Sequence, residues 1–262
     1  MRNFGRVIEV ITNHMLFSST AFTLEGTIPF DDDALPNESE IKIWNLADTS
    51  IQQIKSGQTL IVNAGYRGDV GVILHGFISK VQTAWDGVDR ITTIFILDSE
   101  DLSKRQITEK AYADGTLASY ILKDMASYIG LPIAQFDLVQ DYRYQDGFTA
   151  KGEVTKILSE VAVDCKTAAY INKGKLYIRS LKQGADNRFK LSQDTGMIGS
   201  PSYFEEDGIK GYNVTSQLQY RITTSSVIDL ESRAFQGRLY VRSGSHRFSN
   251  TGDFKTEMEA IQ

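Results

Sequence analysis

Hydrophobic and polar residues alternate along most of residues 7–97. The stretches Ala21–Ile28 and Glu40–Leu46 alternate strictly, which is the pattern of a strand with one buried face. The pair Asp86-Gly87 lies between two β-rich runs, Val72–Val81 and Arg90–Leu97, and such a pair predicts a hairpin turn. Short strands at this spacing are typical of a small barrel or sandwich.

Between residues 105 and 182 the hydrophobic residues recur at helical spacing. The first set follows four-residue steps: Leu117, Ile121, Met125 and Ile129. Such a stripe predicts a helix with one buried face. We expect Gly115-Thr116 to cap its start, and Gly130, followed by Pro132, to end it.

Nearly the same helix occurs a second time. The stretch "ILKDMASYIGLPI" begins at Ile121, and "ILSEVAVDCKTAAYI" begins 36 residues later at Ile157. The second stripe consists of Val154, Ile157, Leu158, Val161 and Cys165. Because both copies present the same apolar face, we expect them to pack on one shared sheet, with residues 168–180 forming a strand, turn and strand. Neither stripe carries a polar residue suited to chemistry, so the duplication indicates a rigid adaptor rather than two active sites.

Alternation returns in residues 190–262 and predicts a second small β unit. Its expected strands are Tyr212–Ile222, Ser226–Ser232, Arg238–Phe248 and Phe254–Ala260. The fold class that follows is α+β and mostly β: small β-barrel-like domains flank a compact α+β domain that holds the two similar helices. We expect these domains at 1–103, 104–188 and 189–262.

Composition limits which partners the protein binds and in which compartment it folds. Hydrophobic residues make up 41% of the 262 and charged residues 23%, as in ordinary globular proteins. The net charge is −5 and Lys and Arg are spread singly, which disfavours nucleic acid as the main partner. The single cysteine allows no intrachain disulfide. Neither a signal peptide nor a run of about 18 apolar residues is present, so we expect folding in the cytoplasm and no membrane anchor.

Residues that carry chemistry are few and scattered. The histidines His14, His75 and His246 fall in three different predicted strands and show no metal-binding spacing. Cys165 occupies an aliphatic position on a helix face, so we interpret it as a small buried residue rather than a nucleophile.

Two stretches resemble known motifs but lack residues that those motifs require. Asp31-Asp32-Asp33 would begin a calcium loop, but the sixth position is Pro36, so we expect a solvated loop. The stretch Gly65–Gly71 contains Arg-Gly-Asp but has no Gly-Lys-Ser/Thr and no following helix, which indicates a turn that reverses a strand. We therefore predict that the protein is not an enzyme and has no catalytic, cofactor-binding or metal-binding residues and no cofactor.

Taken in order, several stretches resemble phage tail baseplate hub proteins, the tail hub or late control protein D-like family of phages and prophages. The first unit carries "GQTLIVNAGY" and "HGFISKVQTAWDGVD". The middle domain carries "GEVTKILSEVAVDC" followed by the hairpin "NKGKLYI", and the last unit carries "SGSHRF" and "GDFKTE". The resemblance covers nearly the whole chain.

This resemblance implies an architecture and transfers no site residues. Such hubs are homotrimers whose six barrel-like domains form a pseudo-sixfold ring. The ring connects the tail tube protein to the central spike or fibre protein. The implied location is the virion tail, assembled in the cytoplasm of the bacterial host.

Two other functions stay open. The first is a cell-wall glycan-binding or hydrolytic tail accessory module, which would need an exposed aromatic platform or a carboxylate pair. Its candidates, Asp141–Asp146 and Trp85-Asp86, lie in predicted turns. The second is the hub of a related contractile secretion device, because phage tails and such devices share the hub fold.

Overall fold

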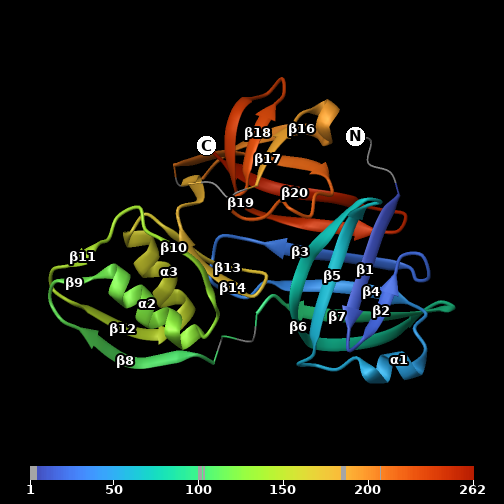
Figure 1. Ribbon diagram of the computed structural model, residues 1–262, viewed down its shortest axis with the longest axis horizontal. Coiled ribbons are helices and arrows are strands. Elements are labelled where there is room, and N and C mark those ends of the chain that lie inside the picture. Colours follow the sequence, from blue (N-terminus) through green and yellow to red (C-terminus); the bar gives the residue numbers. More distant parts are fainter. Residues whose placement is uncertain (1–4, 100–101, 103, 184–186, 207) are drawn as a thin grey trace.

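The computed structural model describes residues 5–99, 102, 104–183, 187–206 and 208–262. We call residues 5–99 the N-terminal unit, 104–183 the middle domain and 187–262 the C-terminal unit. In Figure 1 the middle domain lies to one side of the N-terminal unit, and the C-terminal unit lies above both. The expected division at residues 103 and 188 stays a prediction, and residue 103 itself lies outside the described residues.

Alternation predicted most strands of the N-terminal unit correctly. Because the side chains of a strand point alternately to its two faces, each of these strands buries every second residue. The elements are β1 (Arg6–Thr12), β2 (Met15–Ser18), β3 (Leu24–Phe30), β4 (Glu38–Trp44), α1 (Asp48–Gln53), β5 (Thr59–Tyr66), β6 (Asp69–Asp86) and β7 (Asp89–Leu97). His14, expected in a strand, instead lies in the turn between β1 and β2 with a φ of 64°.

The middle domain repeats one motif at the predicted spacing. Helix α2 (Ala118–Ile129) and helix α3 (Val154–Asp164) start 36 residues apart, and a strand follows each, β10 (Ile133–Asp137) and β13 (Ala168–Asn172). These two strands lie in one sheet, on either side of β14 (Lys175–Arg179). The apolar faces of both helices share a buried cluster with this sheet, as predicted. The remaining strands of the middle domain are β8 (Gln106–Tyr112), β9 (Thr116–Leu117), β11 (Arg143–Tyr144) and β12 (Phe148–Glu153).

The start of α2 differs from the expected cap. The N-cap residue is Leu117, which has no side chain able to cap. Instead, Asp141 reaches the helix from another segment and accepts bonds from Ser119 N (2.9 Å) and Ser119 Oγ (2.6 Å). The end was predicted correctly, because Gly130 takes a left-handed conformation (φ 74°) and closes the helix.

A single open sheet carries both β units. Among the described residues, thirteen strands belong to it. Eleven follow the order β16-β17-β20-β19-β3-β4-β7-β6-β5-β1-β2, while β18 also pairs with β19, and β15 pairs with β18. The strands of the C-terminal unit are β15 (Arg188–Leu191), β16 (Met197–Glu206), β17 (Ile209–Gln217), β18 (Val227–Glu231), β19 (Gln236–Ser249) and β20 (Phe254–Ile261). The mostly-β α+β class is therefore confirmed, although the described strands form one open path rather than closed barrels.

Candidate assembly site

The residues singled out for chemistry do not come together. Within the described ranges, no group of three His, Cys, Asp or Glu side chains could hold a metal ion. Cys165 is fully buried, as predicted. His246 is also buried, and this burial lowers its pKa to about 3, so its ring is neutral at pH 7. The features that stand out instead are contacts between the units and surfaces that a partner could cover.

The two β units meet in a ladder between β3 and β19, which we call the seam. Gly26 faces Phe248 across it, and Gly244 faces Phe30. A Cβ at Gly26 would lie 2.5 Å from Phe248 Cζ, and one at Gly244 would lie 2.7 Å from Phe30 Cζ. Each strand thus supplies one glycine and one phenylalanine ring that covers the opposite glycine. Any larger residue at either glycine would displace a ring.

A polar clamp supplements the seam. Arg221 of the C-terminal unit donates to both carboxylate oxygens of Asp69, at 2.6 and 3.0 Å, and Tyr220 donates to the same carboxylate at 3.1 Å. The hydrogen bond from Arg221 is the main cause that lowers the pKa of Asp69. The aspartate of the Arg-Gly-Asp stretch is therefore occupied within the chain. Paired bonds of this kind fix geometry as well as charge.

The middle domain inserts one turn between the two β units. We call residues 171–174 the hairpin tip; they are the last two residues of β13 and the two-residue turn before β14. Its polar contacts are Asn172 Nδ2 with Thr223 Oγ1 (2.8 Å), Lys173 Nζ with Val72 O (2.7 Å) and Ile171 N with Asp33 O (3.3 Å). The hairpin tip therefore touches both units and fixes the middle domain against them.

A pair of carboxylates lies beside the hairpin tip. The backbone N–H of Asn37 donates to Asp98 Oδ1 (3.0 Å), and its side-chain amide donates to Asp31 Oδ1 (3.2 Å). Burial raises the pKa of Asp98 to about 7 and that of Asp31 to about 6. The solvated-loop prediction is wrong for Asp31 and Asp32, which are half-buried, because the C-terminal unit covers this loop. Sequence reasoning missed this pair because 67 residues separate its members.

The two ends of the sheet path are unpaired among the described strands. Strand β2 pairs only with β1, and β16 pairs only with β17. Exposed apolar side chains lie on both, Leu16 on β2 and Ile198 and Tyr203 on β16. Unpaired strand edges offer backbone donors and acceptors to a strand of another chain. Both edges are therefore candidate interfaces.

The β6–β7 hairpin projects a further apolar group. Trp85 is 71% exposed and Val88 is 90% exposed at its tip. Trp85, expected in a turn, instead lies at the end of β6, and Arg90 lies over its ring at 5.7 Å from the centroid. Large exposed apolar side chains at a projecting tip are suited to contact with a partner.

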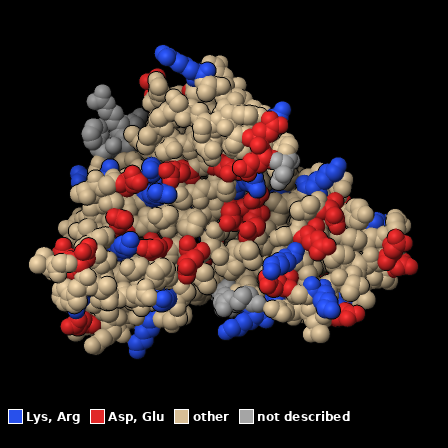
Figure 2. Space-filling view, turned by 180° about the vertical axis from the view of Figure 1, so that it is seen from behind, with Lys and Arg blue, Asp and Glu red and all other residues tan. Residues whose placement is uncertain are grey.

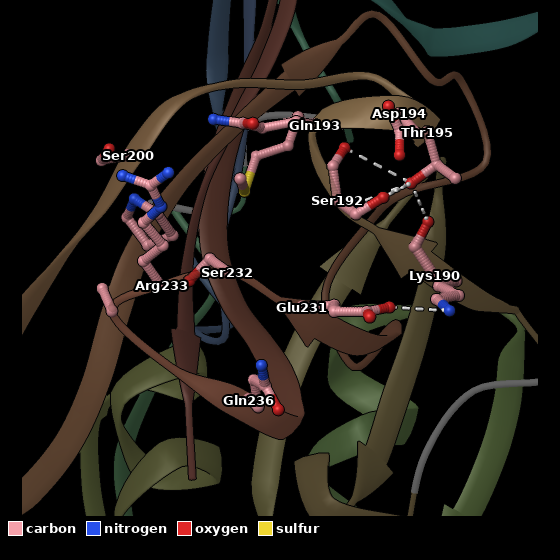
Figure 3. Close-up of a pocket in the computed structure, with 13 residues that line it drawn as sticks. Lys190, Ser192, Gln193, Asp194, Thr195, Ser200, Glu231, Ser232, Arg233 and Gln236 are labelled. Atoms are coloured by element: carbon pink, nitrogen blue, oxygen red, sulfur yellow. Dashed lines mark hydrogen bonds and ion pairs between the residues drawn. The ribbon is translucent and has the colours of Figure 1, made fainter.

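A pocket of about 890 Å³ opens beside β16 (Figure 3). Lys190 Nζ and Glu231 Oε2 form an ion pair (2.7 Å) on one wall, and Thr195 receives and donates hydrogen bonds around Ser192. Gln193 and Arg233 extend from separate segments on the opposite side (Figure 3). The described lining contains neither histidine nor cysteine, and its polar groups come from β15, β16, β18, β19 and the turns between these strands.

Charges of both signs are mixed over the surface. Figure 2 shows basic side chains interspersed with acidic ones across one face of the molecule. Arg247 Nε, for example, lies 2.9 Å from Glu257 Oε2. Nucleic-acid binders usually gather basic side chains into a patch or stripe. That nucleic acid is not the main partner stays a prediction, and the mixed charges on this face support it. Among the described helices, none has the length and apolar character that crossing a bilayer requires.

Two solved structures that resemble this chain are described as tail proteins. A tail protein from Neisseria meningitidis is 8% identical, with 99% of this chain and 97% of that chain covered at a TM-score of 0.71. The 43 kDa tail protein of prophage MuSo2 from Shewanella oneidensis is 10% identical, with 98% and 97% covered and a TM-score of 0.68.

A third similar structure comes from a secretion device. The E. coli c3393 protein, described as a component of the type VI secretion system, is 10% identical, with 96% of this chain and 76% of that chain covered and a TM-score of 0.63. At these identities the likeness establishes the fold. No curated protein sequence matches the chain.

The family follows from a sequence match. The family model described as baseplate hub gp41 matches residues 38–234, which is most of the chain. The chain therefore belongs to the baseplate hub gp41 family, and its role is that of a structural hub of a tail. The resemblance found in the sequence is thereby confirmed.

Proposed function

We propose that three copies of this chain close into a ring that connects the tail tube protein to the central spike or fibre protein. One observation carries the proposal: a single sheet runs through both β units, and its two outermost strands, β2 and β16, have an edge that no other described strand pairs with. When two different edges of identical chains meet head to tail, the contact is heterologous, and such contacts close into rings if the rotation allows. The ring would then present six β units.

The contacts within the chain support a ring of defined curvature. The seam and the Asp69–Arg221 clamp join the two β units at fixed orientation. A ring closes only if each subunit keeps the same angle between its two edges. The interlocked glycines and phenylalanines would supply this rigidity.

We further propose a structural rather than an enzymatic role, in the virion tail of a phage or prophage that assembles in the cytoplasm of its bacterial host. Membership in the baseplate hub family supports this role and location. The hub of a contractile secretion device is a second candidate, favoured by the similarity to the E. coli secretion-system component. The genes that flank the coding sequence distinguish the two.

The test is the solution mass by light scattering coupled to size exclusion. We expect a mass near three times the 29.3 kDa of one chain. A clean monomer at micromolar concentration would count against spontaneous ring closure, and a dimer would contradict the three-copy ring.

Variants on the two edge strands test whether the proposed interfaces hold the copies together. Leu16→Glu on β2 and Ile198→Glu on β16 place a buried charge in the contact, and we expect each to shift the mass towards one chain. Val163→Glu is the matched control, because Val163 is also an exposed apolar residue but lies on α3 of the middle domain. Circular dichroism of all three should match the unmodified protein. Equal masses for the edge variants and the control would contradict pairing through these edges.

A further inference from the structure

We propose that Asp31, Asn37 and Asp98 form a proton-sensitive node that sets how firmly the middle domain is docked against the two β units. The proposal does not depend on ring formation. It starts from position: the node lies where the three parts of the chain meet, and its members come from the segment after β3 and the segment after β7.

The segment that carries Asp31 receives a bond from each of the other two parts. Ile171 N of the hairpin tip donates to Asp33 O (3.3 Å), and Thr224 Oγ1 of the C-terminal unit donates to Asp31 O (2.7 Å). Asp98 also lines a small cavity to which the hairpin tip contributes Ile171, Asn172 and Lys173. A shift of this segment would therefore loosen the contacts of both neighbours.

Asn37 holds the two carboxylates together and supplies no positive charge. Burial is the largest cause that raises the pKa of Asp98 to about 7, and the charges of Asp31 and Asp33 raise it further. Burial is also the largest cause for Asp31, whose pKa rises to about 6, followed by the charge of Asp33. Both carboxylates thus become ionised in the range where most proteins work, and each then repels the other.

Other titratable groups face the node from the neighbouring elements. In the same segment, Asp32 is paired with Arg242 of β19 (3.5 Å), and Asp33 is exposed. The remaining groups are His75 of β6, Lys173 of the hairpin tip and the buried, neutral His246 of β19. Within the described residues, no salt bridge joins a cation to Asp31 or Asp98.

The sign of the effect follows from linkage. A carboxyl whose pKa is raised by docking binds its proton more tightly in the docked state. Docking is therefore firmest below the ordinary carboxyl pKa of about 4 and weakens as the pH rises through about 6 and 7. Lys173 acts in the opposite direction, because burial lowers the pKa of its ammonium group, so its contribution to docking grows as the pH rises.

Hydrogen exchange at the Ile171 amide measures this docking directly, because that amide is bonded to Asp33 O across the interface. The ratio of the exchange rate in the unmodified protein to that in Asp98→Asn cancels the intrinsic pH dependence of exchange. We expect this ratio to rise about tenfold or more between about pH 5.5 and about pH 8. The variant keeps the side-chain oxygen that accepts the Asn37 N–H.

Three further variants make the test decisive. Asp86→Asn, at the exposed tip of the β6–β7 hairpin, is the matched control and should leave the pH dependence unchanged. If Asp98→Asn does not fold, Asp31→Asn replaces it, with a smaller expected ratio. Lys173→Met should retain the loosening at high pH. The node is refuted if Asp98→Asn and the unmodified protein share one pH profile, if the ratio of their exchange rates falls as the pH rises, or if Lys173→Met abolishes the effect.

Discussion

The seam and the hairpin tip join parts of the same chain by opposite means. At the seam, two phenylalanine rings cover two glycines across a backbone ladder, and no titratable group takes part in these two pairs. At the hairpin tip, three polar bonds lie beside the buried carboxylate of Asp98 and the half-buried carboxylate of Asp31, and neither forms a salt bridge within the described residues. The difference suggests a division of roles. The seam would set a permanent angle between the β units, whereas docking of the middle domain would respond to conditions.

The largest expected effect is at the seam. Phe248 is fully buried and covers Gly26, so Phe248→Ala removes a packed ring and exposes the ladder. We expect the free energy of unfolding to fall by about 4 kcal/mol, as for other buried Phe→Ala changes. Denaturant titration measures it. Tyr203→Ala on β16, where the ring is half-exposed, is the control and should cost far less. A loss below about 1 kcal/mol for Phe248→Ala would show that the seam is not well packed.

Enlarging the glycine of the same pair should lower the free energy of unfolding by somewhat less. Gly26→Ala drives a Cβ into the Phe248 ring and towards Glu40 O, 2.9 Å away. We expect a loss of about 2 kcal/mol, typical of overpacking. Because the ring is the flexible partner, adding Phe248→Leu to Gly26→Ala should restore part of this loss. If the two changes are instead additive, Gly26 and Phe248 are not coupled.

The smallest effect is expected at the hairpin tip. Thr223→Val removes the acceptor of the Asn172 side chain. Loss of one such bond costs about 1 kcal/mol, so exchange of the Ile171 amide should quicken about fivefold. Thr149→Val, on an exposed position of β12, is the control and should leave that amide unchanged. A fall in stability of the whole chain as large as that of Phe248→Ala would contradict a locally docked hairpin tip.

Sequence patterns located most of the longer elements of this fold, but several strands escaped them. Strands β1, β3, β4, β5 and β7 bury every second residue over most of their length, and that period is visible in the sequence. Strand β6 shows it only near its middle. Strands β2, β15 and β16 were not predicted, and neither were β9, β11 and β12 of the middle domain. Strand β16 is exposed along most of its length and contains Gly199 and Pro201, so its sequence is typical of a turn. Its strand conformation comes from pairing with β17.

Of the candidate assembly site, the sequence showed only isolated residues. Trp85 was noticed, but its exposure depends on how far the β6–β7 hairpin projects. The acidic run at Asp31–Asp33 was visible, but its partial burial was not, because the covering residues come from segments more than a hundred positions away. Spacing along the chain carries no information about such contacts.

The sequence by itself determined the class, the repeated helix, the family and the absence of any recognisable catalytic motif. These depend on local periodicity and on short motifs, which neighbouring residues decide. Only the tertiary structure decided the rest: the cap of α2 by Asp141, the glycine–phenylalanine pairs of the seam and the two carboxylates joined by Asn37. Each depends on which distant segments the fold brings within a few ångströms, where packing and burial set the energies.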